Sequence, residues 1–143
     1  NDAAGAVTRL IDMNVEPFLI SSTLESVLAQ RLVRTICQKC KTSMQPDKTL
    51  LEHLNLTEEA VAGRPFYYGK GCSECHEAGY RYRKSLVEYM TVTQPIRELI
   101  NDRKPTLIIR AKAVELGMRL LRDDGVRNIL DGYTTAEEVL RYT

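Results

Sequence analysis

Four cysteines in two Cys-x-x-Cys pairs constrain this chain more than any other feature of its 143 residues. The pairs are Cys37/Cys40 and Cys72/Cys75, and 31 residues separate them. Two thiolates spaced in this way can face one point, and four of them match the tetrahedral ligand set of structural zinc. The separation exceeds the roughly 15–20 residues of a compact zinc ribbon, so we expect a side excursion between the pairs.

The residues alone leave alternatives to zinc open. The four thiols could be unconnected buried side chains, or they could form a redox or disulfide pair. Residues 1–13 form an amphipathic segment rather than a signal peptide, which favours metal over disulfides. His76 could in principle replace a ligand, whereas His53 is expected on the surface. A site whose four ligands all come from protein folds the polypeptide and does not activate water.

Composition narrows the functional class. Hydrophobic residues make up 43% of the chain and charged residues 27%, which is typical of a soluble globular protein. The formal net charge of +1 disfavours a protein that depends on phosphate contacts, so nucleic acid is an unlikely partner. No apolar run approaches the roughly 18 residues that span a bilayer. The opening Asn1-Asp2-Ala3 already stands at a helix start, and we interpret the chain as a fragment of a longer protein.

Hydrophobic periodicity predicts two helices before the first cysteine. The first covers residues 2–13, with Asp2 as its cap. The second covers residues 18–36, with an apolar stripe. Arg31 and Arg34 would then lie near the negative end of its dipole. The stripe consists of Ile20, Leu24, Val27 and Leu28.

Strand signals are confined to the cysteine-bearing region. We expect a short helix over 57–63 closed by Gly63, and extended segments over 66–68 and 80–90. From Pro95 the chain is predicted to be helical again. The signals in that tail are the apolar face Ile96, Leu99 and Ile100, a cap at Thr106 before Ile109, Ala113, Val114 and Leu116, interruptions at Gly117 and Gly125, and a capping box from Thr134 to Glu137 before Val139 and Leu140.

These signals predict a mostly α (α+β) fold in three parts. Residues 1–36 would be the carboxy-terminal part of an α/β domain, residues 37–90 a zinc-binding subdomain with short strands, and residues 91–143 a helical subdomain. If the first two helices belong to an α/β domain, its sheet lies largely upstream.

No catalytic motif is recognisable, so we predict no catalytic residue. The segment from Gly63 to Gly71 resembles a phosphate-binding loop, but its spacing is one residue too long and it lacks the hydroxyl that would hold magnesium. Two histidines and a closed metal site offer little material for acid–base chemistry. By itself the chain is not expected to be an enzyme.

Several runs, in order along almost the whole chain, together resemble one family: the type II secretion and type IV pilus assembly ATPases. The runs are Asn1–Leu10 (NDAAGAVTRL), Glu16–Ile20 (EPFLI), Ala29–Arg34 (AQRLVR) leading into the first cysteine pair, Gly71–Cys75 with Gly79–Arg83 (GYRYR), Gly117–Arg119, Asp124–Gly125 and Gly132–Arg141 (GYTTAEEVLR).

The resemblance implies a RecA-like, hexameric, cytoplasmic motor docked on an inner-membrane platform and serving protein transport or pilus assembly. ATP and Mg²⁺ would bind the parent protein, whose Walker motifs precede this segment. The four cysteines correspond to the family's zinc-binding tetracysteine motif. Gln30, Arg31 and Arg34 correspond to a stretch near the nucleotide cleft and the subunit interface, although packing at a helix end explains Arg31 and Arg34 equally well.

The chain departs from the family pattern after the second cysteine pair. Tyr82 replaces the usual small residue, and Lys84-Ser85 replaces the usual Thr-Gly, which puts partner contacts of that strand in doubt. A second hypothesis is a free-standing zinc module that binds nucleic acid, and a third is a protein-interaction adaptor. The second draws on four tyrosines interleaved with four cations: Tyr67, Tyr68, Tyr80 and Tyr82 with Lys70, Arg81, Arg83 and Lys84.

Overall fold

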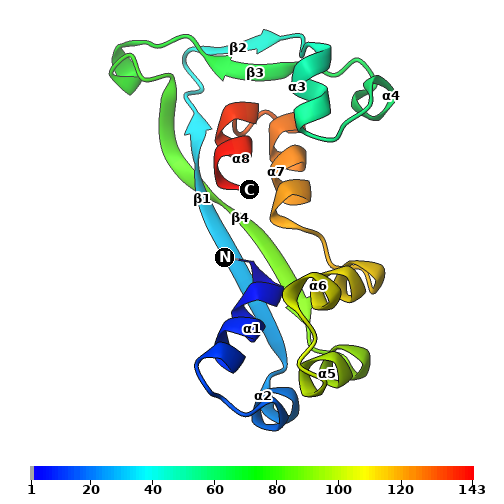
Figure 1. Cartoon of the computed structure of the whole chain (residues 1–143). Helices are drawn as coiled ribbons and strands as arrows, with labels where there is room; N and C mark the ends of the chain where they lie inside the picture. The colour runs from blue at the N-terminus through cyan, green and yellow to red at the C-terminus, as the bar shows by residue number, and fades with distance from the viewer. Residues whose placement is uncertain (1) are drawn as a thin grey trace. The chain divides into compact units, whose positions relative to one another are not determined.

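The computed structural model describes residues 2–143, and they form two compact units, each built from two separate stretches of chain. The first unit contains the described residues up to Gln30 together with Val87–Leu121, and the second contains Arg31–Leu86 and Arg122–Thr143. Helices predominate, as predicted, and the four strands form two two-stranded sheets (Figure 1). One sheet pairs β1 (Ser26–Ile36) with β4 (Tyr80–Thr91).

The first unit packs four helices around a single apolar core. Asp2 caps α1 as predicted, because its carboxylate accepts the Gly5 N–H at 2.6 Å. A buried Glu88 carboxylate also accepts the Ala3 N–H at 2.8 Å. The helices are α1 (Ala3–Asp12), α2 (Pro17–Thr23), α5 (Gln94–Asn101) and α6 (Thr106–Glu115). The buried core comprises Ala3, Ala4, Val7, Ile20, Met90, Val92, Ile96, Ile100, Ile109, Ala113 and Met118.

The second unit contains a small antiparallel sheet and the carboxy-terminal helices. Strands β2 (Lys41–Met44) and β3 (Phe66–Gly69) pair from Lys41 opposite Gly69 to Met44 opposite Phe66. The chain between them forms the expected side excursion. The helices are α3 (Lys48–His53), α4 (Glu58–Val61), the 3-10 helix η1 (Ser73–Cys75), α7 (Leu121–Leu130), which begins at the last residue of the first unit, and α8 (Ala136–Tyr142).

The predicted helix over 18–36 is wrong, because α2 ends at Thr23 and β1 follows. The hydroxyls of Ser22 and Thr23 donate to the Leu19 carbonyl oxygen, at 3.2 and 2.6 Å, so the side chains satisfy the backbone at the helix end. Beyond it, exposure alternates from residue to residue over 27–33, which is the period of a strand. Arg31 and Arg34 therefore lie on β1, and the helix-dipole explanation does not apply to them.

Two expectations for the tail also need correction. Gly125 does not interrupt a helix but lies inside α7, where a Cβ atom would stand 2.4 Å from Val139 Cγ1 of α8. The cap of α8 is Thr135 rather than Thr134, and its hydroxyl accepts the Glu138 N–H at 3.3 Å. The Thr134 hydroxyl instead donates to the Arg34 carbonyl oxygen at 2.8 Å.

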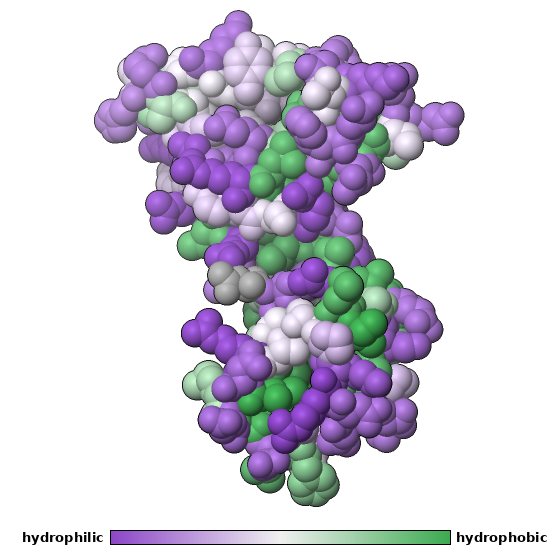
Figure 2. Space-filling model, in the orientation of Figure 1, coloured by the Kyte–Doolittle hydropathy of each residue, from purple (hydrophilic) through white to green (hydrophobic). Residues whose placement is uncertain are grey.

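Helix α6 is less amphipathic than its spacing indicates. Pro105, not Thr106, occupies its cap position, and the expected core residues Val114 and Leu116 are exposed. Together with Leu107 and Ile108 they place apolar side chains on the surface around α6 (Figure 2). Among residues 2–143, no helix combines the length and hydropathy that crossing a membrane requires.

Candidate metal centre

Strand pairing brings the two cysteine pairs together. The first pair joins the end of β1 to the start of β2, and the second lies between β3 and β4. The Lys70 N–H donates to the Cys40 carbonyl oxygen at 3.1 Å, and the Cys37 N–H donates to the Gly79 carbonyl oxygen at 3.0 Å. Each knuckle is therefore tied through the backbone to the segment that carries the other, although 31 residues separate them in sequence.

The four sulfur atoms form one cluster. All four Sγ atoms lie within 4.8 Å of one another. The Cys37–Cys72 and Cys40–Cys75 distances are both 3.9 Å, and the Cys72–Cys75 distance is 3.7 Å. A tetrahedron with metal–sulfur bonds of about 2.3 Å has edges of about 3.8 Å, whereas a disulfide needs about 2.05 Å. The four cysteines are free in the structure, and their thiols lie in one cluster rather than apart.

Two glycines allow the second knuckle to close. The flanks of the knuckle approach so closely that a Cβ atom on Gly69 would stand 2.0 Å from the Gly79 carbonyl oxygen, and a Cβ atom on Gly79 would stand 2.4 Å from the Gly69 carbonyl oxygen. Gly79 also has φ +76°, a conformation that side chains rarely adopt. Any larger residue at either position would push the two ends of the knuckle apart.

Backbone N–H groups point at the sulfur of Cys75. Those of Cys72 and Gly79 donate to it, at 3.3 and 3.2 Å. Burial raises the pKa of the Cys75 thiol, but these hydrogen bonds and the neighbouring thiols lower it by more, to about 7. For Cys40 burial dominates and raises the pKa to about 12, and burial also raises the pKa of Cys72. The raised pKa values mean that Cys40 and Cys72 keep their protons at neutral pH unless a cation displaces them. The spacing of the four sulfur atoms means that the cluster could hold a metal ion.

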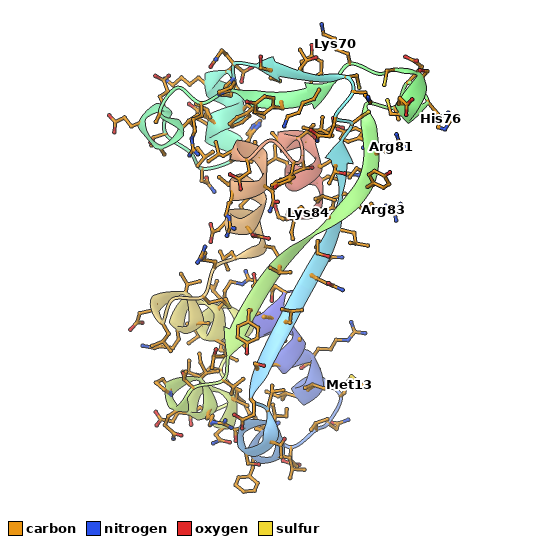
Figure 3. The ribbon with its side chains drawn as sticks, turned by 180° about the vertical axis from the view of Figure 1, so that it is seen from behind. Met13, Lys70, His76, Arg81, Arg83 and Lys84 are labelled. Atoms are coloured by element: carbon orange, nitrogen blue, oxygen red, sulfur yellow. The ribbon has the colours of Figure 1, made fainter. Side chains whose placement is uncertain are left out.

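The histidines lie outside the cluster. His76 is exposed at the end of the second knuckle, with φ +51° (Figure 3). His53 is exposed on α3, as expected. Among the residues that the structure describes, the group of potential ligands consists of the four cysteines. Beside the knuckle, Arg81 Nη1 of β4 binds Glu74 Oε2 at 2.9 Å, and this carboxylate raises the pKa of the guanidinium.

The residues expected near a nucleotide, Gln30, Arg31 and Arg34, all lie on β1. Gln30 is exposed in the first unit, Arg31 is half-buried in the second, and Arg34 is bound within the second unit by Glu138. A contact of these residues with a nucleotide or a neighbouring subunit stays a prediction.

The ion pair between Arg34 and Glu138 is a polar feature that the sequence analysis did not predict. Arg34 Nη2 and Nε lie 2.6 and 2.9 Å from Glu138 Oε1, and the Arg34 N–H donates to Oε2 at 2.8 Å. The guanidinium also lies 4.0 Å from the centre of the Tyr80 ring. The only sequence signal for this ion pair is the position of Glu138, three residues after Thr135 as in a capping box.

Comparison with known proteins identifies the family to which the sequence is similar. The family described as "Type II/IV secretion system protein" matches residues 1–141. The chain is 45% identical over 143 residues to the type IV pilus assembly ATPase PilB of Thermus thermophilus and 42% identical over 143 residues to the type II secretion system protein E of Pseudomonas aeruginosa. It is 38% identical over 141 residues to the type IV pilus assembly ATPase TfpB of Acinetobacter baylyi.

These alignments take in 100%, 100% and 99% of the chain but only 16%, 28% and 24% of the respective relatives. The chain thus spans less than a third of the length of each of the three. Because the match is continuous from residue 1 to residue 141, it includes both units and the cysteine cluster. The chain belongs to the type II/IV secretion system protein family.

Proposed function

We propose that this chain is the carboxy-terminal part of a motor ATPase that powers type II protein secretion or type IV pilus assembly. In the proposed parent, a homo-hexamer, ATP and Mg²⁺ bind upstream of this segment, and the motor works in the cytoplasm against an inner-membrane platform. The names of the relatives support this assignment. The segment offers structural support rather than catalytic groups, so we expect no ATP hydrolysis by the 143-residue chain.

We further propose that Cys37, Cys40, Cys72 and Cys75 bind one structural Zn²⁺. The observation that carries this proposal is the set of sulfur–sulfur distances of 3.7–3.9 Å, which fits the edges of a tetrahedral zinc–sulfur site. Four cysteines are one of the ligand sets that closed structural zinc sites use. In zinc-finger peptides such binding contributes about 10–16 kcal/mol to folding at neutral pH, so the ion would dominate the stability of the knuckles and the small sheet beside them.

Replacement of one ligand tests the zinc proposal. We expect the purified chain to contain one zinc per molecule and Cys72→Ser to contain none, as measured by plasma mass spectrometry. Hydrogen exchange should speed up over residues 37–86 in the variant while α1 and α2 stay protected, because these helices belong to the first unit. Ser73→Ala, an exposed neighbour, is the matched control. Stoichiometric zinc in the Cys72→Ser protein would refute the assignment.

The motor assignment needs the parent protein. We expect the full-length protein to hydrolyse ATP and to form hexamers, and Cys72→Ser in that protein to lose zinc. A parent without nucleotide hydrolysis would contradict the motor assignment and leave the zinc measurement unaffected, so the two proposals can fail separately.

A further inference from the structure

Strand β4 carries one residue more than its partner. The Cys37 N–H donates to the Gly79 carbonyl oxygen, and the Val92 N–H donates to the Glu25 carbonyl oxygen. Twelve residue steps separate Glu25 from Cys37, whereas thirteen separate Gly79 from Val92. Tyr82, with φ +70°, is the one residue of positive φ inside any strand of residues 2–143. A β-bulge at Tyr82 accounts for the extra residue.

This bulge is costly for a tyrosine. A bulky side chain in the left-handed region is a genuine outlier, because its Cβ crowds the following carbonyl oxygen. Tyr82 cannot recover the cost by burial, since it is 76% exposed. Neither the conformation nor the packing of β4 explains why a large aromatic residue occupies this position.

The bulge changes what the strand presents. From Leu86 onward, buried and exposed residues alternate along β4, but Arg81, Tyr82 and Arg83 are exposed in succession. We call these three residues the bulge triad. In Figure 3 its two arginines are labelled along the first half of β4. Lys84 is engaged elsewhere, with its ammonium 3.9 Å from the centre of the Tyr133 ring.

The charges of the triad are incompletely balanced. The Arg81 guanidinium lies 5.3 Å from the centre of the Tyr82 ring and binds Glu74 at an exposed site, where an ion pair contributes little and can exchange partners. Within residues 2–143 no salt bridge involves Arg83. The surface thus offers one aromatic face and two guanidinium groups, each of which matches a carboxylate.

We propose that the bulge triad is a docking site for an acidic segment of a partner protein. The guanidinium groups of Arg81 and Arg83 bind carboxylates of that segment, and the Tyr82 ring packs against an apolar side chain between them. Tyrosine and arginine are enriched at the centres of protein interfaces, whereas lysine is depleted there. Electrostatic lipid binding instead needs a cluster of about four to eight cations, and nucleic-acid binding usually needs a basic domain.

The test separates binding from folding. The probe is a short fluorescein-labelled peptide of glutamate and leucine, titrated with the zinc-loaded chain and followed by anisotropy. We expect Tyr82→Gly and Arg83→Gln each to weaken binding about fivefold or more, which is about 1 kcal/mol, a loss that only a minority of interface residues cause when they are truncated. Arg141→Gln removes another exposed arginine beside a tyrosine ring, Tyr142, and should leave the affinity unchanged.

The stability of Tyr82→Gly distinguishes a docking role from a structural one. Glycine tolerates the left-handed conformation, so this variant should have the melting temperature of the unsubstituted chain or one a few degrees higher. A lower melting temperature would show that the ring supports the fold and would overturn the proposal. The proposal also fails if the peptide does not bind at millimolar concentration, if Tyr82→Gly binds it normally, or if an oligothymidylate or phosphatidylglycerol vesicles bind the triad more tightly than the peptide.

Discussion

Replacing Glu138 by glutamine removes a buried charge that ties β1 to α8 within the second unit. The Glu138 side chain is 0% exposed, and its two oxygens accept three hydrogen bonds from Arg34. Glutamine keeps one acceptor oxygen, but its amide N–H groups would face either the guanidinium or the Arg34 backbone N–H. At least one donor is then left opposed by another donor.

The size of the effect follows from the exposure of the two partners. Breaking a fully buried ion pair costs about 3–5 kcal/mol, because the remaining charge is left without a partner in a region of low polarity. Here the Arg34 side chain is 41% exposed, so water solvates the released guanidinium, and we expect a loss of about 2–3 kcal/mol. Glu137→Gln, one residue earlier and exposed, should change stability by less than about 0.5 kcal/mol.

The same contact predicts a dependence on pH. Burial raises the pKa of the Glu138 carboxyl, but the hydrogen bonds and charge of Arg34 lower it by more, so its pKa lies below the usual value. The unfolded chain therefore takes up this proton more readily than the folded chain. The stabilisation by Glu138 is complete above the unfolded pKa of about 4.3 and is lost as pH falls through the lower folded value.

Urea denaturation followed by circular dichroism, with hydrogen exchange of the α8 amides, measures both effects. The difference in unfolding free energy between the parent and Glu138→Gln should be constant from about pH 5 to 7 and shrink at lower pH. Comparison with a variant cancels the contribution of thiol protonation, which both proteins share. Equal stability of Glu138→Gln and Glu137→Gln at neutral pH, or a difference that grows on acidification, would refute the reasoning.

Two further substitutions probe one contact in the second unit and one in the first. Gly125→Ala should lower stability by about 1–2 kcal/mol despite the better helix propensity of alanine, because its Cβ would stand 2.4 Å from Val139 Cγ1. A double-mutant cycle with Val139→Ala should show favourable coupling between the two positions. Strictly additive changes in stability would argue against the contact. Glu88→Gln should cost about 2–3 kcal/mol, because the carboxylate accepts the N–H groups of Ala3 and Leu121 at 2.8 and 3.1 Å. Faster exchange of both amides, with no change in Glu98→Gln, checks this prediction.

Local chemistry made some of this structure predictable. A two-residue gap between cysteines, an aspartate before a helix and glycines around a tight knuckle act within a few residues of themselves. The cysteine cluster, the Asp2 cap and the strands at Phe66–Gly69 and Tyr80–Thr91 could therefore be anticipated. Strand β2 lacks such a signal and was not predicted. Helix α3 was also not predicted, although Asp47 caps it as Asp2 caps α1, with its carboxylate accepting the Leu50 N–H at 2.7 Å.

The errors have a non-local origin. The apolar residues Ile20, Leu24, Val27 and Leu28 satisfy a helical period by coincidence, but Val27 and Leu28 belong to β1, whose partner β4 begins at Tyr80. Pairing with a strand so far along the chain overrides local propensity. Gly125 was predicted to interrupt a helix because the reason for a glycine at this position is not local. Val139 of the next helix leaves no room for a side chain there.

The position of Arg34 on β1 links the ion pair to the metal centre. Cys37 follows Arg34 three residues later, and hydrogen bonds join the backbone between them to the loop before α8. The Ile36 N–H donates to the Tyr133 carbonyl oxygen at 2.9 Å, and the Thr134 hydroxyl donates to the Arg34 carbonyl oxygen at 2.8 Å. Because β1 is hydrogen-bonded at Arg34 and at Ile36, the end of the strand holds Cys37 in a defined direction. The zinc binding that we propose would gain from this order, because Cys37 would lose less conformational freedom when the ion binds. Helix α8 and the loop before it thus help to order a cysteine of the candidate metal centre without providing a ligand.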